Sequence, residues 1–299
     1  MILKKREIPL ELQLLRSLRP RMQFSEKEES YYQHKEKGFE GELHFDKWAE
    51  PLKDIIFLND LNILYNKTNC QIDSIGISSS TIHIFEIKNF EGDYTIKEGK
   101  WYSPKGFVVN NPLIQLEKAE TIVNQLVKNF GYSLTVQPHL IFINPDFHLY
   151  DAPSNLPIVY PTQLVRVKEK LQRHCTKITR TETQFAEKLY SINMDKSPHA
   201  NLPEYKYESL RKGIVCPNCR VFYKSMAKCF YCESCEEKES CYEAVLRSVE
   251  EFKTLFPDCK VTTTQIQEWC GIVQDKRTIR RVLVENYKGQ GLKMGNFYL

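Results

Sequence analysis

Two predicted strands carry charged side chains at positions that are otherwise apolar, and these charges are the residues best suited to chemistry. Side chains on a strand alternate between two faces, so Glu86 and Lys88 share one face of the run Thr81–Asn89. Asp73 shares a face with isoleucines on the preceding strand. A short turn would pair the two strands antiparallel and bring Asp73 close to Glu86 or Lys88.

Two carboxylates beside a lysine provide the oxygen ligands that Mg²⁺ prefers, with phosphate oxygens filling the remaining positions. The lysine can orient or deprotonate an attacking water, or stabilise the negative charge that builds on a phosphoryl group. A structural ion pair between Glu86 and Lys88 is the alternative interpretation. Because such a pair is costly to desolvate and adds little stability, we expect a functional use.

The three charges also belong to a longer pattern. Asp73, twelve intervening residues and then Glu86-Ile87-Lys88 resemble the Asp…(Asp/Glu)-x-Lys core of the PD-(D/E)XK nuclease superfamily. The surrounding segments occur in the order seen in the nuclease-related domain (NERD) family, which this part of the chain resembles. These segments are Gly38–Glu42, Gln71–Asp73, Phe85–Gly92, Trp101 and Asn111–Gln115.

The resemblance implies a restriction-endonuclease-like α/β fold, in which a mixed sheet is flanked by helices, and a nuclease activity that depends on Mg²⁺ or Mn²⁺. It also implies a catalytic set of Glu42, Asp73, Glu86 and Lys88, with Gln115 lining the site and the metal bound by Asp73 and Glu86. Without the resemblance, Glu42 would be a solvated helix carboxylate and Gln115 a helix-surface amide.

The elements that must position these residues can be predicted from apolar spacing and from helix-end signals. Ser25 and Glu28 form a capping box that begins a helix to about residue 49, and Pro51 prevents its continuation. Strands are expected at 55–58, 70–78, 81–89, 93–96, 136–143 and 158–160, and helices at 111–131, 163–175 and 181–191. Two glycines, Gly38 and Gly41, lie inside the first helix and suggest a close backbone approach there.

A second candidate site lies in the cysteine-rich segment that follows. Two Cys-x-x-Cys pairs, Cys216/Cys219 and Cys232/Cys235, are separated by twelve residues, which is the spacing of a structural Zn²⁺ site closed by four thiolates. This segment resembles a zinc ribbon. Because Cys229-x-x-Cys232 is also a possible pair, Cys229 is an alternative ligand.

The C-terminal residues predict a helix-turn-helix or winged-helix-like module. Its last helix would bury Ile279, Val282 and Leu283 and expose four cations, Lys276, Arg277, Arg280 and Arg281. Residues 257–299 contain seven basic and four acidic side chains, an excess that suits contact with a phosphate backbone. A solvated basic face on a small helical bundle is the alternative.

Composition limits the remaining possibilities. The chain has 299 residues, 41% of them hydrophobic and 27% charged, and a net charge of only +4. No apolar run approaches the roughly 20 residues of a membrane helix, and no signal-peptide pattern follows the basic start, so we expect a cytoplasmic protein without membrane contact. The predicted divisions are an N-terminal helical extension (1–36), the NERD domain (37–192), a linker (193–212), the zinc-ribbon-like module (213–241) and the winged-helix-like module (242–299).

Two functions from different classes follow. The first is a metal-dependent nuclease that cuts nucleic acid, DNA in particular, with the zinc ribbon and basic helix delivering substrate. The second is a non-catalytic nucleic-acid-binding protein whose nuclease-like domain does not cleave. The set of Glu42, Asp73, Glu86 and Lys88 is intact, which favours catalysis. The sequence predicts no oligomeric state.

Overall fold

The computed structural model describes residues 1–174, 176–194, 202–224, 229–291 and 297–299, which form two compact units. The first unit contains Met1–Ile8 and Gln33–Pro198, and the second contains Pro9–Tyr32 and His199–Leu299. The expected N-terminal extension 1–36 is therefore divided between the units. Part of the expected linker, residues 195–201, lies outside the described residues. Among the described residues, no helix combines the length and apolar character needed to cross a membrane.

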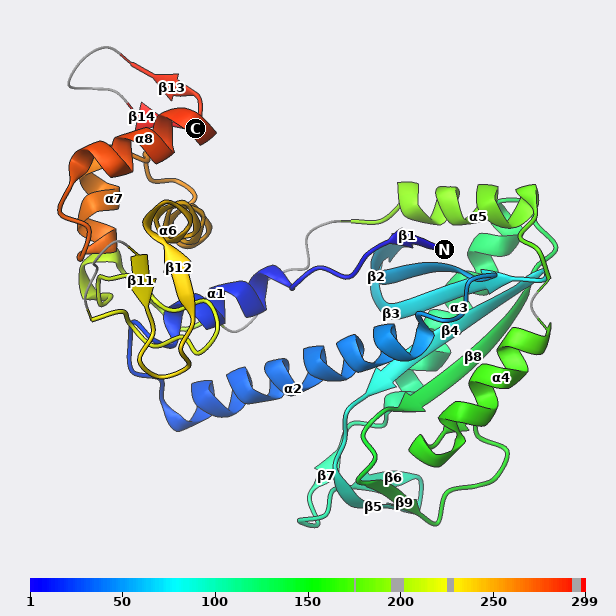
Figure 1. Cartoon of the computed structure of the whole chain (residues 1–299). Coiled ribbons are helices and arrows are strands. Elements are labelled where there is room, and N and C mark those ends of the chain that lie inside the picture. The colour runs from blue at the N-terminus through cyan, green and yellow to red at the C-terminus, as the bar shows by residue number, and fades with distance from the viewer. Residues whose placement is uncertain (175, 195–201, 225–228, 292–296) are drawn as a thin grey trace. The chain divides into compact units, whose positions relative to one another are not determined.

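The first unit is built on a six-stranded mixed sheet with the order β1-β2-β3-β4-β8-β10 (Figure 1). The strands are β1 (Ile2–Lys4), β2 (Ile56–Tyr65), β3 (Thr68–Ser78), β4 (Thr81–Lys88), β8 (Thr135–Phe142) and β10 (Ile158–Val159). Strands β2, β3 and β4 pair antiparallel, whereas β8 is parallel to both β4 and β10. The mixed sheet expected from the resemblance is thus confirmed.

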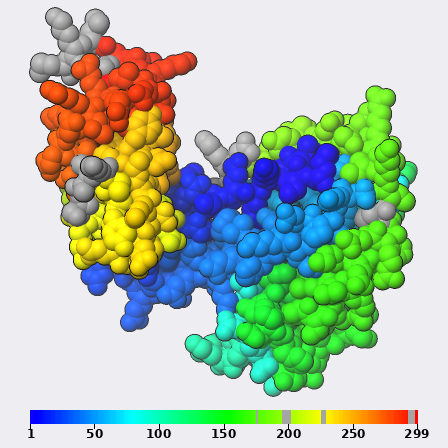
Figure 2. Space-filling model, viewed as in Figure 1, coloured from blue at the N-terminus to red at the C-terminus, as the bar shows by residue number. Residues whose placement is uncertain are grey.

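Among the described residues, four α-helices, a short 3-10 helix (Pro161–Gln163) and a smaller sheet complete this unit. The helices are α2 (Glu26–Ala49, which begins in the second unit), α3 (Pro112–Asn129), α4 (Leu164–His174) and α5 (Arg180–Ser191). The smaller sheet, in the order β7-β6-β5-β9, contains β5 (Gly92–Lys97), β6 (Lys100–Tyr102), β7 (Val108–Val109) and β9 (Phe147–Tyr150). Figure 2 shows the green part of the chain, which includes α4, on the outside of the unit.

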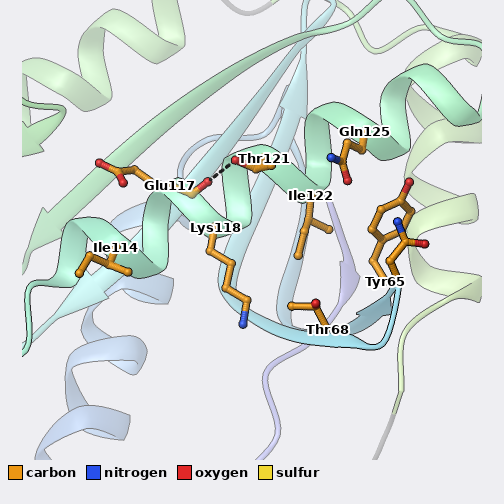
Figure 3. A pocket seen from close by; sticks show the side chains of 9 residues that line it. Tyr65, Thr68, Ile114, Glu117, Lys118, Thr121, Ile122 and Gln125 are labelled. Carbon is orange, nitrogen blue, oxygen red and sulfur yellow. Dashed lines mark hydrogen bonds between the residues drawn. The ribbon is translucent and has the colours of Figure 1, made fainter.

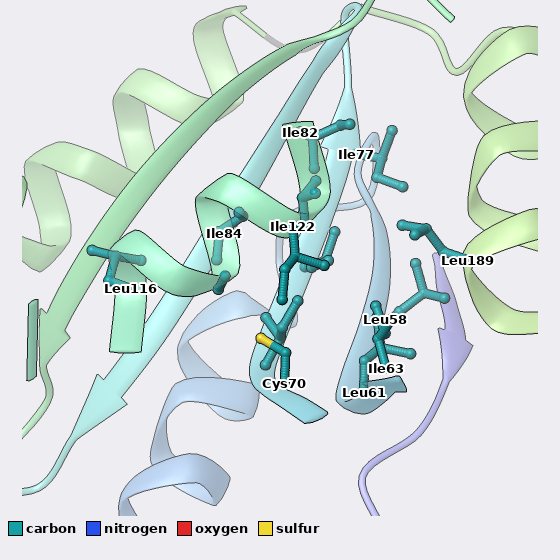
Figure 4. Packing of buried hydrophobic residues seen from close by; sticks show 14 of the residues in the cluster. Leu58, Leu61, Ile63, Cys70, Ile77, Ile82, Ile84, Leu116, Ile122 and Leu189 are labelled. Carbon is teal, nitrogen blue, oxygen red and sulfur yellow. The ribbon is translucent and has the colours of Figure 1, made fainter. Parts of the chain in front are cut away.

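Both faces of the main sheet are buried. On one face, Ile82 and Ile84 of β4 belong to the same apolar cluster as Leu116 and Ile122 of α3 (Figure 4). On the other face, Phe85 and Ile87 of β4 cluster with residues of α2 and α4. Strand β4 is therefore a central strand covered on both sides, as its almost continuous apolar run predicts.

The second unit combines the cysteine-rich segment with helices. Its elements are α1 (Leu10–Leu18), β11 (Cys229–Tyr231), β12 (Lys238–Ser240), α6 (Cys241–Leu255), α7 (Thr263–Cys270), α8 (Lys276–Asn286), β13 (Gly289–Gln290) and β14 (Phe297–Tyr298). After α6, α7 and α8, β13 and β14 pair antiparallel, and Val261 bridges to Tyr298. Three helices and a short antiparallel strand pair thus follow the cysteine-rich segment, and the winged-helix-like module stays a prediction.

Helix α1 is part of the core of the second unit. Leu14 and Leu18 share its apolar cluster with Phe252 and Trp269. Just after α1, the Arg21 guanidinium is fully buried and donates to Glu251 at 2.6 Å. A segment near the N-terminus is therefore required to complete the C-terminal unit.

Candidate active site

The β3–β4 hairpin positions the central charges. Residues 79–80 form a two-residue turn in which both φ angles are positive (48° and 60°), the geometry whose twist matches paired antiparallel strands. Starting at this turn, β3 and β4 pair residue by residue as far as Ser74 and Phe85. Asp73 and Glu86 are the next residue on each strand, so the register sets them side by side at one end of the hairpin.

Hydrogen bonds then fix the side chains at this end. The Ile87 backbone N–H donates to Asp73 Oδ2 at 2.8 Å. Lys88 Nζ donates to Glu86 Oε1 at 2.6 Å and to Gln115 Oε1, on the first turn of α3, at 2.9 Å. The structure thus brings Asp73, Glu86, Lys88 and Gln115 together from three separate elements.

Helix α2 carries the fifth predicted residue, Glu42, and approaches the end of β4 closely. A Cβ atom added at Gly41 would lie only 2.5 Å from Asn89 Cβ, so a larger residue cannot be accommodated without movement. Asn89 also donates from Nδ2 to the Lys37 backbone oxygen at 2.7 Å. The close approach suggested by the helix glycines is real at Gly41, whereas Gly38 has no atom within 4 Å of an added Cβ.

A further cation, Arg6, enters the site from the segment after β1. Its side chain is only 2% exposed. It donates to Glu42 Oε2 at 2.6 Å, to Asp46 Oδ2 at 3.0 Å and to the Asp73 backbone oxygen at 3.0 Å. Sequence reasoning missed Arg6 and Asp46, because nothing in a short basic N-terminal run indicates which of its cations is buried.

Burial and the charge of Asp73 perturb both glutamates of the site. Burial and the neighbouring Asp73 charge raise the pKa of Glu42 to about 8, although Arg6 opposes this shift. Burial and Asp73 also raise the pKa of Glu86 to about 7, against the effect of Lys88. Burial lowers the pKa of Lys88, but the charges of Glu86 and Asp73 outweigh it and raise that pKa overall. A cation added among these carboxylates would relieve their repulsion.

Each carboxylate has one oxygen held by a protein donor. Within the described part of the chain, Glu42 Oε1, Asp73 Oδ1 and Glu86 Oε2 accept no hydrogen bond from another residue. The oxygens of the three carboxylates do not converge as closely as the ligands of a preformed metal site. Among the described residues, only the cysteine cluster discussed below has three or more metal-ligating atoms that all lie within 4.8 Å of one another. The donor set nevertheless fits Mg²⁺ or Mn²⁺, which bind carboxylate oxygens and keep several waters.

Comparison with protein families bears on this arrangement. Residues 37–143 match the nuclease-related domain. The match contains Glu42, Asp73, Glu86, Lys88 and Gln115, and it confirms the resemblance seen in the sequence. Comparisons with curated proteins and with solved structures gave no match. The match to the nuclease-related domain suggests interaction with nucleic acid. Arg6, which contacts Glu42, lies outside the matched residues.

Beyond the nuclease-related domain, four cysteines of the second unit form a potential metal site. The sulfur atoms of Cys216, Cys219, Cys232 and Cys235 all lie within 4.8 Å of one another. The shortest separations are 3.3 Å between Cys219 and Cys232 and 3.6 Å between Cys216 and Cys235. The cluster is compatible with a zinc ribbon, and four sulfur ligands would leave no open coordination position.

The two Cys-x-x-Cys turns have the same backbone geometry. Arg220 N–H donates to the Cys216 oxygen, and Glu236 N–H donates to the Cys232 oxygen. Arg220 and Glu236 each follow the second cysteine of a pair and have φ near 60°. Cys229, the alternative ligand, is exposed in β11 and lies outside the cluster.

Helix α8 presents the predicted basic residues to solvent. Ile279, Val282 and Leu283 are fully buried, as the helical spacing predicts. The four cations Lys276, Arg277, Arg280 and Arg281 are all exposed. Asp275 caps the helix by accepting a hydrogen bond from the Arg277 N–H at 3.0 Å.

A pocket of about 380 Å³ lies in the first unit between α3 and the β2–β3 turn (Figure 3). Its lining includes Tyr65, Thr68, Glu117, Lys118 and Gln125. None of the five predicted site residues lines it, so this pocket is separate from the carboxylate cluster.

Proposed function

We propose that the chain is a nuclease that hydrolyses phosphodiester bonds of nucleic acid, DNA in particular, with the help of Mg²⁺ or Mn²⁺. The observation that carries the proposal is the arrangement at the end of the β3–β4 hairpin. There, Asp73 and Glu86 each have one oxygen that accepts no hydrogen bond from the described residues, and Lys88 Nζ donates to both Glu86 and Gln115. The match of residues 37–143 to the nuclease-related domain supports it.

In this proposal Asp73 and Glu86 hold the divalent ion, and Glu42 is an outer or second-metal ligand. When bound, the ion would polarise a phosphoryl oxygen and make a bound water more acidic. The Ile87 N–H keeps the Asp73 carboxylate in one orientation before substrate arrives. Arg6 does the same for Glu42.

Lys88 has the contacts of a charge stabiliser. Its ammonium group can donate three hydrogen bonds, and two of them go to Glu86 and Gln115. The third donor is available to a phosphoryl oxygen or to the attacking water. Gln115 therefore positions the lysine head group, and a positively charged donor at this point would stabilise the developing negative charge.

In this proposal the second unit binds nucleic acid but does not cleave it. We assign a structural Zn²⁺ to the four clustered cysteines, and phosphate contacts to Lys276, Arg277, Arg280 and Arg281 of α8. Purified protein should then contain about one zinc per chain by elemental analysis. Cys216→Ser should lose it, whereas Cys229→Ser should retain it. Protein prepared without chelator and found free of zinc would refute the assignment.

A non-catalytic nucleic-acid-binding protein is the second candidate function. One observation favours it: in the described chain the three carboxylates each have a protein cation or N–H as partner and do not converge on one point. In that case Arg6 and Lys88 would take the place of metal ions.

Cleavage assays distinguish the two functions. Plasmid, linear duplex and single-stranded DNA would be incubated with the full chain and Mg²⁺ or Mn²⁺, with EDTA and Glu86→Ala as controls. The nuclease proposal predicts cleavage that requires the metal and is lost in the variant. Nucleic-acid binding without cleavage of any substrate under either metal would favour the second candidate.

A further inference from the structure

A local excess of positive charge also lies in the first unit, in addition to that of the basic C-terminal segment. Residues 164–180, which comprise α4 and the segment after it, contain six basic side chains and one acidic side chain. The remainder of the first unit carries a net charge of −4. Four of the six cations lie on α4, Lys177 follows it and Arg180 begins α5, so positive charge is concentrated in this part of a unit that is otherwise acidic.

The spacing of these cations gives α4 two different faces. Val167 and Leu171 pack toward the apolar cluster of the sheet. Arg166, Lys170 and Arg173 follow the spacing i, i+4, i+7 and are all exposed, so they form one stripe about 10 Å long on the outer face. We call these three residues the α4 stripe.

The stripe is almost free of compensating charge. Among described residues, the ion pair found for it joins Arg173 to Glu169 at 3.9 Å, and both side chains are more than half exposed. Such a pair is weak in water. The stripe therefore keeps most of its positive potential.

We propose that the α4 stripe binds the phosphate backbone of nucleic acid, and this proposal rests on the nuclease function above. Nucleic acid is the occupant whose charge complements the stripe, because duplex DNA carries one phosphate charge per about 1.7 Å of its axis. A stripe of 10 Å therefore faces several phosphates. The proposed contacts are to phosphate oxygens, which carry no base-sequence information.

A hydrogen bond connects the start of α4 with the helix that carries Glu42. Trp48 Nε1 of α2 donates to the Leu164 backbone oxygen at 3.1 Å. Glu42 and Trp48 are six residues apart, or about 9 Å along the helix axis. Helix α4 then runs to the β3–β4 turn, where Ser79 Oγ donates to the His174 backbone oxygen at 2.9 Å, at the end of the hairpin opposite Asp73 and Glu86. The stripe would therefore hold nucleic acid along this side of the unit and would not by itself place a phosphodiester bond at the carboxylates.

The test measures binding and not cleavage, so its failure differs from failure of the nuclease proposal. Full-length protein carrying Glu86→Gln would be titrated with a labelled 30-base-pair duplex in EDTA at several salt concentrations. Because each phosphate contact releases counterions, replacing Arg166, Lys170 and Arg173 by Gln should lower the salt slope by about 2 to 3. We expect the affinity to fall roughly tenfold or more.

The matched control removes the same charge elsewhere. Lys53, Lys67 and Lys128 are exposed lysines dispersed over the same unit, and replacing them by Gln should leave the slope nearly unchanged. A second variant acts in the opposite direction: Glu169→Gln removes the acidic residue of α4 and should tighten binding. Equal slopes for the stripe and control variants, or no response to Glu169→Gln, would overturn the proposal.

Discussion

Arg6 is a buried cation that contacts the candidate carboxylates. It lies about 30 residues before the nuclease-related domain begins, yet its guanidinium contacts Glu42, Asp46 and the Asp73 backbone. A buried cation with three acidic neighbours is strongly favoured electrostatically, and the same neighbours are strongly disfavoured without it. The charge balance of the site therefore depends on a residue outside the domain that contains the site.

Replacing Arg6 by Gln should destabilise the protein by roughly 3 kcal/mol, because it leaves Glu42 and Asp46 without their buried partner. Urea unfolding followed by circular dichroism measures this loss. Lys5→Gln is the matched control, since Lys5 is exposed and its replacement should change stability by less than about 0.5 kcal/mol. Equal stabilities of the two variants would show that the Arg6 network contributes nothing.

A buried histidine pair gives the first unit a pH dependence. His83 Nδ1 and His139 Nε2 are 3.1 Å apart. Burial lowers the pKa of His83 to about 4, and burial together with the His83 and Lys170 charges lowers that of His139 to about 3. Between pH 6.5 and about 4 the unfolded chain therefore binds more protons than the folded chain, so stability falls as the pH is lowered.

The expected slope in this range is roughly 1.4 kcal/mol per pH unit for each histidine that stays neutral in the folded state. The variant His83→Gln/His139→Gln should show a flatter dependence when the free energy of unfolding is measured between pH 4 and pH 7. Carboxylates titrate in both proteins and cancel in the comparison. If the free energies of unfolding of the two proteins had the same pH dependence, protonation of the histidine pair would not destabilise the folded state.

At the scale of elements, α2 provides a direct test of the close approach at the site. Gly41→Ala places a Cβ 2.5 Å from Asn89 Cβ, so the helix that carries Glu42 must move. We expect lower stability and slower cleavage. Gly38→Ala meets no atom within 4 Å and should instead stabilise the helix by about 1 kcal/mol. The measurement is the midpoint of thermal unfolding of both variants. A change of the same sign in both midpoints would contradict this account.

Most elements of the first unit could be predicted because their signals are local. The capping box at Ser25 and Glu28 marks the start of α2, and Asn111 followed by proline marks that of α3. The two-sided apolar run of β4 indicates a central strand. Once the strands were placed, their register was enough to bring Asp73 and Glu86 together.

The missed elements depend on long-range contacts. Strand β1 has three residues and is defined by its pairing with β2, more than 50 positions away. Strand β9 pairs with β5 in the smaller sheet, again between distant segments. The position of Arg6 follows from β1, so it could not be predicted without that pairing. The charge of α4 was visible in the sequence, but only the structure gives its exposure.

For the whole molecule, the division of the chain limits which truncations are informative. Removing residues 199–299 leaves Leu14 and Leu18 of α1 without the cluster that buries them. We expect this fragment to bind a hydrophobic dye and to aggregate, and Leu14→Ser/Leu18→Ser should reduce both effects. A monomeric fragment that binds no dye would contradict this role of α1. Substitutions in α8 are therefore the better test of nucleic-acid binding by the second unit.

The central claim is that Asp73, Glu86 and Lys88 catalyse metal-dependent cleavage of nucleic acid. The most direct measurement is the single-turnover rate of plasmid cleavage in Mn²⁺ by the parent and three full-length variants. Asp73→Asn and Glu86→Gln should abolish cleavage while duplex binding is retained, and Lys88→Ala should slow it by about 10²–10⁴-fold, the usual contribution of a positioned proton-transfer or charge-stabilising group. Cleavage by Asp73→Asn and Glu86→Gln at the parental rate would contradict the claim.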